Sequence, residues 1–265
     1  MNKLQTPLPA PTSDLAQAVA DLRDEGVCLV RDALDAPTLE RVRTALYRAA
    51  DDDRQRRREV KFIMDNARDD TNQRVWNLPS RDPIFCDLVE HPLALELVRA
   101  AIGWPALLSN ISANITGPGG GEMIMHADQL FAPQPWSGMH GVNIMWCVDD
   151  FRDDNGATRM VPRSHLLNRT PTGEDQSTET VALEAAAGTL VAMDGRIWHK
   201  TGNNRTASER RAGVFAFYTM PIYRTQENWF LALDPSIRQF GSDNLLVLFG
   251  YRSEGLGLVN GASPC

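Results

Sequence analysis

The chain of 265 residues is long enough to bury a large core, and its length fits one large domain or two small ones. Hydrophobic residues make up 43% of it and charged residues 23%, which is ordinary for a soluble globular enzyme. The net charge of −7 argues against a protein that holds nucleic acid by neutralising phosphates, because that task needs a basic surface.

The cysteines and the start of the chain bear on its location. Cys28, Cys86, Cys147 and Cys265 are scattered and form no Cys-x-x-Cys motif, which favours a reducing, cytoplasmic compartment. Residues 1–11 are polar and proline-rich, so no secretory signal is expected. No apolar run approaches the roughly 18 residues of a membrane span, and we predict neither a membrane nor a nucleic-acid partner.

The first hundred residues predict helices around one short strand. After an expected loose lead over residues 1–13, the caps Thr12 to Asp14 open a helix that Gly26 closes. Residues 27–30 read as a buried strand, and Pro37 suits the first turn of a second helix. Residues 84–102 form a third helical stretch, with a break at His91-Pro92.

Residues 51–59, DDDRQRRRE, are charged at every position but one. Such a run favours a solvated helix end or loop. The alternative is that Arg54 and residues 56–58, all arginine, form a patch for an anionic substrate tail.

From residue 107 the pattern changes to short apolar or alternating runs separated by Gly, Pro and Asn. The predicted strands cover residues 107–115, 123–126, 142–148, 157–161, 189–193 and 213–220. This spacing is typical of an all-β sandwich or barrel. Helix and loop return after Arg224, and no repeat or linker is evident. We therefore predict one domain over residues 1–265, a mainly β core with flanking helices (α+β).

The triplet His126-Ala127-Asp128 is the first candidate for chemistry. On a strand, residues i and i+2 face the same side, so the imidazole and the carboxylate would project together. With a distant second histidine they would form the two-His, one-carboxylate facial arrangement that leaves positions open on Fe(II). Five His and 34 Asp plus Glu give about 0.6 chance matches to such a triplet, so the motif alone is weak.

His199 is the preferred partner among the other histidines. It follows the predicted strand 189–193 and a turn, where a side chain can reach into a barrel mouth. His91 is expected at a helix end, His140 on a turn, and His165 in a structural role.

Arg210 leads into the apolar strand 213–220. An arginine buried there would need an anion, and a guanidinium binds a carboxylate with two parallel hydrogen bonds. The alternative is that Arg210 and Arg211 are surface charges just before the strand.

Four motifs in order resemble the phytanoyl-CoA dioxygenase family of Fe(II)/2-oxoglutarate oxygenases. They are His126-Ala-Asp128, the block from Asp153 to His165, the segment His199 to Asn204, and Arg210. The middle block departs from the family pattern at Arg163, where glycine is usual. The resemblance covers residues 20 to 225.

The resemblance implies a double-stranded β-helix (a cupin-like jelly-roll) with His126, Asp128 and His199 on Fe(II). It implies that Arg210 and Thr201 hold the far carboxylate of 2-oxoglutarate. Thr158, Trp146 and Asn77 are further cosubstrate-pocket candidates. With O2, such an enzyme decarboxylates 2-oxoglutarate to succinate and oxidises a substrate C–H bond. A carboxylate at Asp128 argues against the related halogenases, which carry a small residue there.

The substrate is less well defined by the sequence. A small, hydrophobic, natural-product-like molecule is preferred, with hydroxylation as the default outcome and Phe131, Trp136, Met139 and Trp229 as candidate pocket residues. A fatty acyl-CoA and an amino-acid-type substrate are the alternatives. A non-oxidative cupin-like enzyme and an inactive ligand-binding jelly-roll are the rivals of another class. Both a monomer and a homodimer are compatible with the sequence.

Overall fold

Nine strands form two antiparallel sheets in the computed structural model, which describes residues 7–62, 65, 71–253 and 255–265. The larger sheet has the order β1-β7-β4-β9-β3-β2 and the smaller one the order β6-β5-β8. The strands are β1 (Val27–Val30), β2 (Asn72–Val75), β3 (Leu107–Thr116), β4 (Gly141–Cys147), β5 (Thr158–Met160), β6 (Val181–Ala182), β7 (Leu190–Asp194), β8 (His199–Thr201) and β9 (Arg211–Thr219).

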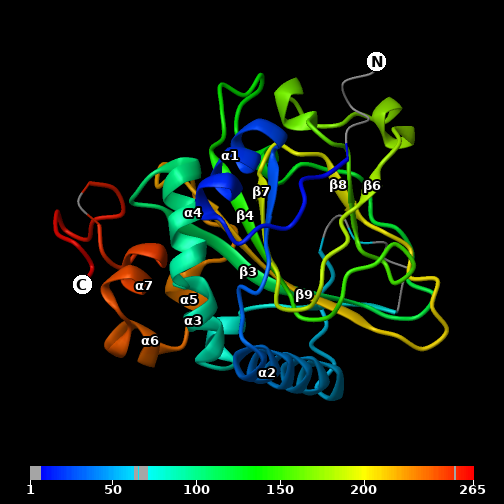
Figure 1. Ribbon diagram of the computed structural model, residues 1–265. Helices are drawn as coiled ribbons and strands as arrows, with labels where there is room; N and C mark the ends of the chain where they lie inside the picture. Colours follow the sequence, from blue (N-terminus) through cyan, green and yellow to red (C-terminus); the bar gives the residue numbers. More distant parts are fainter. Residues whose placement is uncertain (1–6, 63–64, 66–70, 254) are drawn as a thin grey trace.

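Helices cover the outer face of the larger sheet (Figure 1). They are α1 (Leu15–Glu25), α2 (Ala36–Gln55), α3 (Ile84–Val89), α4 (Pro92–Ile102), α5 (Trp229–Ala232), α6 (Pro235–Phe240) and α7 (Asp243–Leu248). Their apolar side chains pack with every second residue of β3, β4 and β9, such as Ile111, Ile144 and Val214. Since one face of the sheet is buried this way, the other is free to form an interior with the smaller sheet.

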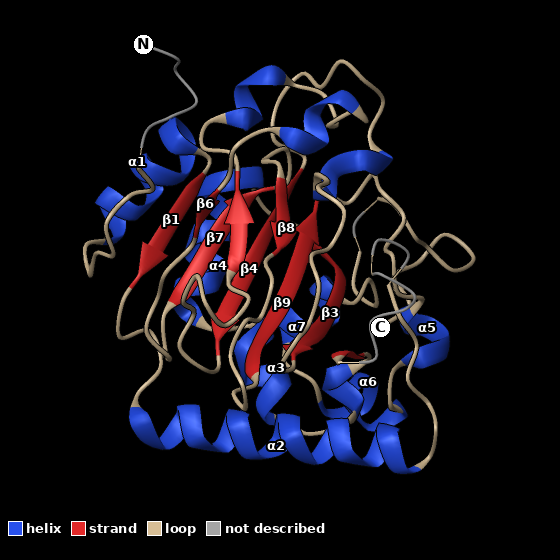
Figure 2. Cartoon of the chain, turned by 90° about the vertical axis from the view of Figure 1, so that its right-hand side faces the viewer, coloured by secondary structure: helices blue, strands red, loops and turns tan. Residues whose placement is uncertain are grey.

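The strands of the smaller sheet lie over one face of the larger sheet (Figure 2), and a second core lies between the two sheets. Met145 of β4 and Val191 of β7 pack there with Met160 of β5. Helices and sheets in this arrangement give the predicted α+β architecture with a jelly-roll core.

A bulge in β3 sets which residues face this interior. Leu108 pairs with Tyr218, and the next pair is Asn110 with Phe217, so Ser109 is the extra residue. Leu108 lies in the helix-side core although Asn110 faces the interior cavity. Before the bulge the even-numbered residue Leu108 faces the helices, and after it the odd-numbered residues, such as Ile111, face them.

Several predicted elements are confirmed. β1 covers residues 27–30 as predicted, α1 is capped by Asp14 and ends at Gly26, and α3 and α4 are separated at His91-Pro92. The charge run begins within the last turn of α2 and is exposed at most positions. Arg56 pairs with Asp52 at 2.6 Å and Arg54 with Asp51 at 3.9 Å, so much of this positive charge is locally balanced.

The predicted strand over residues 123–126 was wrong. Only His126 forms a β-bridge there, and a 3₁₀ turn, η2 (Asp128–Phe131), follows at once. The short strands β2, β6 and β8 were not predicted, because two to four residues carry too little periodicity to recognise.

The N-terminal lead pairs with the sheet where the structure describes it. Residues 1–6 lie outside the described residues, but Thr12 N donates to Leu29 O at 3.0 Å and Thr12 O accepts from Arg31 N at 3.0 Å. Among the described residues, no helix combines the length and apolar character needed to cross a bilayer.

Gly26 fixes the distance between α1 and the segment that carries His165. Its φ is +79°, and a Cβ added there would lie 2.4 Å from His165 Nδ1. We expect Gly26→Ala to lower the free energy of unfolding by about 2–4 kcal/mol, because a strained backbone adds to an overlap with a buried ring. Gly257→Ala is the matched control, since φ is +76° there and nothing lies within 4 Å. Equal losses in the two variants, measured by denaturant unfolding, would contradict the overlap.

Candidate metal centre and active site

Reciprocal backbone hydrogen bonds bring the two predicted histidines together. His126 N donates to His199 O at 3.0 Å, and His199 N donates to His126 O at 2.9 Å. The ring centroids lie 4.4 Å apart, and both side chains are nearly buried. The loop after β3 is thereby joined to β8 of the smaller sheet.

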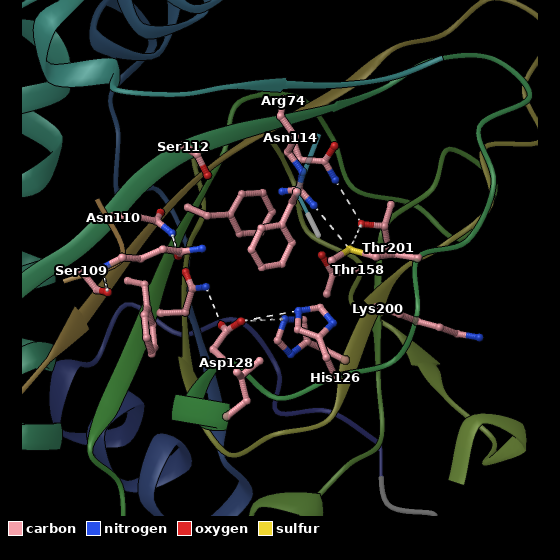
Figure 3. Close-up of a pocket in the computed structure, with 18 of the residues that line it drawn as sticks. Arg74, Ser109, Asn110, Ser112, Asn114, His126, Asp128, Thr158, Lys200 and Thr201 are labelled. Carbon is pink, nitrogen blue, oxygen red and sulfur yellow. Dashed lines mark hydrogen bonds and ion pairs between the residues drawn. The ribbon is translucent and has the colours of Figure 1, made fainter. Parts of the chain in front are cut away.

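Asp128 completes the cluster from the first residue of η2. Its Oδ1 lies 3.6 Å from His126 Nε2 and 3.7 Å from His199 Nε2. Ligand atoms from the three residues all lie within 4.8 Å of one another. The three side chains form a candidate site for one metal ion, with the donor set of a facial two-His, one-carboxylate centre (Figure 3).

The hydrogen bonds of each imidazole leave its Nε2 free for a metal. His126 Nδ1 lies 3.0 Å from Ile124 O, and His199 Nδ1 lies 3.1 Å from Ile197 O. A carbonyl oxygen only accepts, so both Nδ1 atoms carry the proton and Nε2 keeps its lone pair.

The protonation states also suit metal binding. Burial lowers the pKa of His199, which favours the neutral imidazole. Burial alone would raise the pKa of Asp128, but His199 and His126 in their protonated forms and the amide of Asn143 lower it well below its usual range, so the carboxylate stays ionised. Asn143 Nδ2 donates to Asp128 Oδ2 at 2.8 Å, which leaves Oδ1 as the oxygen directed at the histidines.

The metal residues line a cavity of about 400 Å³ between the sheets. Its apolar wall consists of Phe62, Trp76, Leu130, Phe131, Phe215 and Phe217. Its polar wall includes Thr158, Thr201 and Asn114, and Asn114 Nδ2 donates to Thr201 Oγ1 at 3.1 Å. The predicted residues Thr158 and Thr201 are therefore brought to the same cavity as the metal residues (Figure 3).

Arg211 is fully buried just beyond this polar wall. Its Nη2 donates to Thr116 Oγ1 at 2.8 Å and to Gly156 O. Thr116 is two residues from Asn114, and Gly156 is two residues from Thr158. Its guanidinium lies 4.5 Å from the centroid of the Phe151 ring, and its Nε and Nη1 have no partner among the described residues. Burial lowers the pKa of Arg211 to about 10, so the side chain is still cationic at neutral pH.

Three predicted cosubstrate residues lie outside the cavity. Arg210 faces α2, with its guanidinium 4.8 Å from the centroid of the Tyr47 ring. Trp146 faces the helix-side core, because Asn143 and Met145 occupy the interior face of β4. Asn77 has a structural role, since its Nδ2 donates to Ala232 O at 2.6 Å and its Oδ1 accepts from Ser80 Oγ at 3.0 Å.

The other histidines and aromatic candidates are mostly structural. The His91 ring packs edge-on against Trp146, and His165 is buried beside Gly26. Of the predicted pocket residues, Phe131 lines the cavity. Trp136, Met139 and Trp229 pack in or against the apolar cores.

Sequence reasoning missed Asn143 and Arg211. The alternation of side chains along a strand could have indicated both residues. Asn143 alternates with residues of β4 that face the helices, and Arg211 lies on the same face of β9 as Phe215 and Phe217. Phe62, Trp76 and Arg74 reach the cavity from around β2, which was not predicted.

Comparison with known proteins gives one family and several relatives. The family model described as phytanoyl-CoA dioxygenase (PhyH) matches residues 22–212. Dioxygenase af480 of Aspergillus fumigatus is 38% identical over 182 residues, which cover 67% of this chain and 58% of that protein. The uncharacterized protein Rv1501 of Mycobacterium tuberculosis is 27% identical, with 85% of this chain and 82% of that protein covered. The chain thus matches less than two thirds of the length of af480.

Solved structures share the fold at lower identity. The epimerase SnoN, in complex with Fe3+, alpha ketoglutarate and nogalamycin RO, superposes with a TM-score of 0.63 at 20% identity, covering 82% of this chain and 88% of that one. HygX from Streptomyces hygroscopicus, with nickel, 2-oxoglutarate and hygromycin B bound, gives a TM-score of 0.62 at 14% identity, covering 79% and 88%.

The family model spans more than half of the chain and includes His126, Asp128 and His199. The predicted family and jelly-roll fold are thereby confirmed. The chain belongs to the phytanoyl-CoA dioxygenase family.

Proposed function

We propose that this protein is an Fe(II)- and 2-oxoglutarate-dependent dioxygenase that hydroxylates a C–H bond of a small, mainly apolar molecule and releases succinate and CO2. The observation that carries the proposal is the joint placement of a His-Asp-His cluster in the cavity and a buried, uncompensated Arg211 behind its polar wall. The dioxygenase af480 and the SnoN complex with Fe3+ and alpha ketoglutarate are in keeping with it.

His126, Asp128 and His199 would hold the iron. Two neutral imidazoles and one carboxylate neutralise one of the two charges of Fe(II) and leave coordination positions for small ligands. When bound, the metal would activate O2, which is the oxidant for both 2-oxoglutarate and the C–H bond. Asn143 orients Asp128 for this role, because it donates a hydrogen bond to the oxygen that does not face the histidines.

Arg211 would bind the far carboxylate of 2-oxoglutarate. A buried guanidinium is costly unless an anion compensates it, and the Nε and Nη1 atoms without partners are donors that suit a carboxylate. Thr201 and Thr158 lie between His199 and Gly156 along the smaller sheet, so they would flank the cosubstrate. This assignment replaces Arg210, which the strand directs to the opposite face.

The apolar wall favours a small hydrophobic substrate over a fatty acyl-CoA. Phe62, Trp76 and Phe131 offer ring surfaces next to the metal residues. The arginines of the charge run at residues 51–59 have ion pairs at Arg54 and Arg56, which weakens the case for an anionic substrate tail there.

The proposal also includes a cytoplasmic location, no nucleic-acid partner, and a monomer or homodimer. The free thiols of Cys28, Cys86 and Cys147 support the proposed cytoplasmic location.

Mixing the protein with Fe(II) and 2-oxoglutarate without O2 tests the proposed centre. We expect a weak visible metal-to-ligand charge-transfer band in the wild type and none in His126→Ala, because the variant lacks one of the three ligands. Circular dichroism checks that both proteins are folded. A folded wild type without the band would refute the oxygenase and favour a non-oxidative metal enzyme or an inactive binding protein.

Arg211 and Arg210 give a matched pair for the cosubstrate. We expect Arg211→Gln to weaken 2-oxoglutarate binding about 100-fold, since the variant loses the buried charge that pairs with the carboxylate. Arg210→Gln should change it by less than about twofold, because the half-buried guanidinium of Arg210 lies against the Tyr47 ring and not beside the cavity. Titration of the visible band measures both affinities, and Fe(II) binding without 2-oxoglutarate shows that the metal site is intact. If Arg210→Gln weakens 2-oxoglutarate binding more than Arg211→Gln does, Arg210 is the residue that binds the carboxylate.

Asn143 gives a test of how Asp128 is oriented. We expect Asn143→Ala to weaken Fe(II) binding by about 10- to 100-fold, because Asp128 Oδ2 loses its donor and the carboxylate turns away from the histidines. Ser112→Ala, which removes a hydroxyl from the same cavity without touching Asp128, should leave metal affinity unchanged. Competition with a chelator measures both. Equal affinities in Asn143→Ala and the wild type would show that Asp128 needs no such support.

A further inference from the structure

One of the charged side chains that line the cavity stands out by having no partner. Asp128 belongs to the metal centre, and Lys200 Nζ pairs with Glu122 Oε2 at 2.6 Å. Arg74 Nη2 and Nε contact the carboxylate of Asp65 at 2.8 and 3.0 Å. Arg224 also lines the cavity, but it forms no hydrogen bond or ion pair with any residue that the structure describes.

The backbone around Arg224 is held in place on both sides. The Tyr223 hydroxyl lies 2.6 Å from His140 Nδ1. Gln226 N donates to Ser109 Oγ at 3.0 Å, and Glu227 N donates to Ser109 O at 2.9 Å. Arg224 is exposed at the edge of the cavity, so its guanidinium is accessible to a ligand, and the fixed main chain beside it restricts where that charge can lie.

Arg211 is buried behind the polar wall at one end of the cavity, and Arg224 lines the cavity at the other end. Arg211 is paired with Thr116 at one end of β3, and the Arg224 segment is bonded to Ser109 near the other end. Seven steps separate Ser109 from Thr116, which correspond to about 23 Å at a strand rise of about 3.3 Å per residue. A small dicarboxylate held at Arg211 cannot also contact Arg224, so the second charge is available to a different ligand.

The surroundings of Arg224 define the chemistry of that ligand. Phe131 packs edge-on against both Phe217 and Tyr223, with ring centroids 5.9 and 4.7 Å away, and forms an apolar surface at this end of the cavity. The polar groups nearby are uncharged, namely the hydroxyl groups of Ser109 and Ser112 and the side-chain amides of Asn110 and Gln226, which bond to each other (Figure 3). A molecule that fits both parts has an apolar ring body and one anionic group.

We propose that Arg224 binds the carboxylate of the primary substrate, which is a monocarboxylic acid with a ring-containing apolar body. The inference rests on the proposed function, because the body of the acid would lie over the metal centre. A single guanidinium matches one carboxylate with two parallel hydrogen bonds. A dianionic phosphate would keep an excess negative charge, since the other cations lining the described part of the cavity are already paired. The rings of the substrate exclude water from the pair and strengthen it.

Three naphthalene compounds test the inference: 1-naphthylacetate, its neutral analogue 1-naphthylacetamide, and 1-naphthyl phosphate. Their dissociation constants are measured by calorimetry without O2 on the protein loaded with Fe(II) and 2-oxoglutarate. The variants are Arg224→Gln, Arg224→Lys, and Arg41→Gln as a control. Arg41 is exposed on α2 away from the cavity, and its loss makes the same change in net charge.

We expect the wild type and Arg41→Gln to bind 1-naphthylacetate about tenfold more tightly than 1-naphthylacetamide. Arg224→Gln should bind the two compounds equally, and Arg224→Lys should retain part of the preference. Binding of 2-oxoglutarate, followed by its visible band, should be the same in all four proteins.

The inference is overturned if the wild type binds acid and amide equally, if the preference survives in Arg224→Gln, or if the phosphate binds more tightly than the carboxylate. It is also overturned if Arg224→Gln weakens 2-oxoglutarate binding, because Arg224 would then serve the cosubstrate. A normal visible band together with any of the first three results leaves the proposed function intact. Absence of the band in the folded wild type removes the proposed function, and the substrate inference falls with it.

Discussion

The mutual backbone pairing of His126 and His199 is the constraint on which the candidate site depends. Two segments 73 residues apart each donate to the carbonyl of the other. Each histidine also directs its Nδ1 to the carbonyl two residues before it, Ile124 or Ile197. The same local geometry is thus used twice, and it points both Nε2 atoms to one side. Asp128 needs no strand to join them, because the turn that follows the bridge brings its carboxylate back to the pair.

The interior divides into zones by how its charges are compensated. Around the metal residues, the single negative charge of Asp128 would be balanced by the metal ion, and Asn143 restrains the carboxylate. Behind the threonines, Arg211 is buried and its Nε and Nη1 have no partner among the described residues, and the proposed cosubstrate would supply the missing negative charge. At the other end, Arg224 is cationic beside rings and amides. The two proposed roles together would let the site bind two acids at once, one at each arginine.

The sequence was sufficient for the features that are local or ordered along the chain. The triplet at His126, the later His199 and the family blocks could be read directly, as could the helix caps at Asp14 and Gly26. The sequence did not determine which of two neighbouring residues on a strand faces the cavity. Arg210 and Arg211 are neighbours, and only the strand pairing of Arg211 with Thr116 decides which faces inward. The same uncertainty misplaced Trp146. Asn77 failed for another reason, since its partners Ala232 and Ser80 are set by tertiary packing.

The bulge at Ser109 makes β3 sensitive to a change in its length. Because an extra residue there restores the correct faces on both sides, the part of β3 before the bulge and the part after it are independent in register. Substitutions around Asn110 and Gln226 therefore act on the mouth alone, while the loss of one residue would turn Leu108 from the helix-side core towards the cavity. A single insertion or deletion between Leu108 and Asn110 would exchange the buried and the cavity-facing side chains on one side of the bulge.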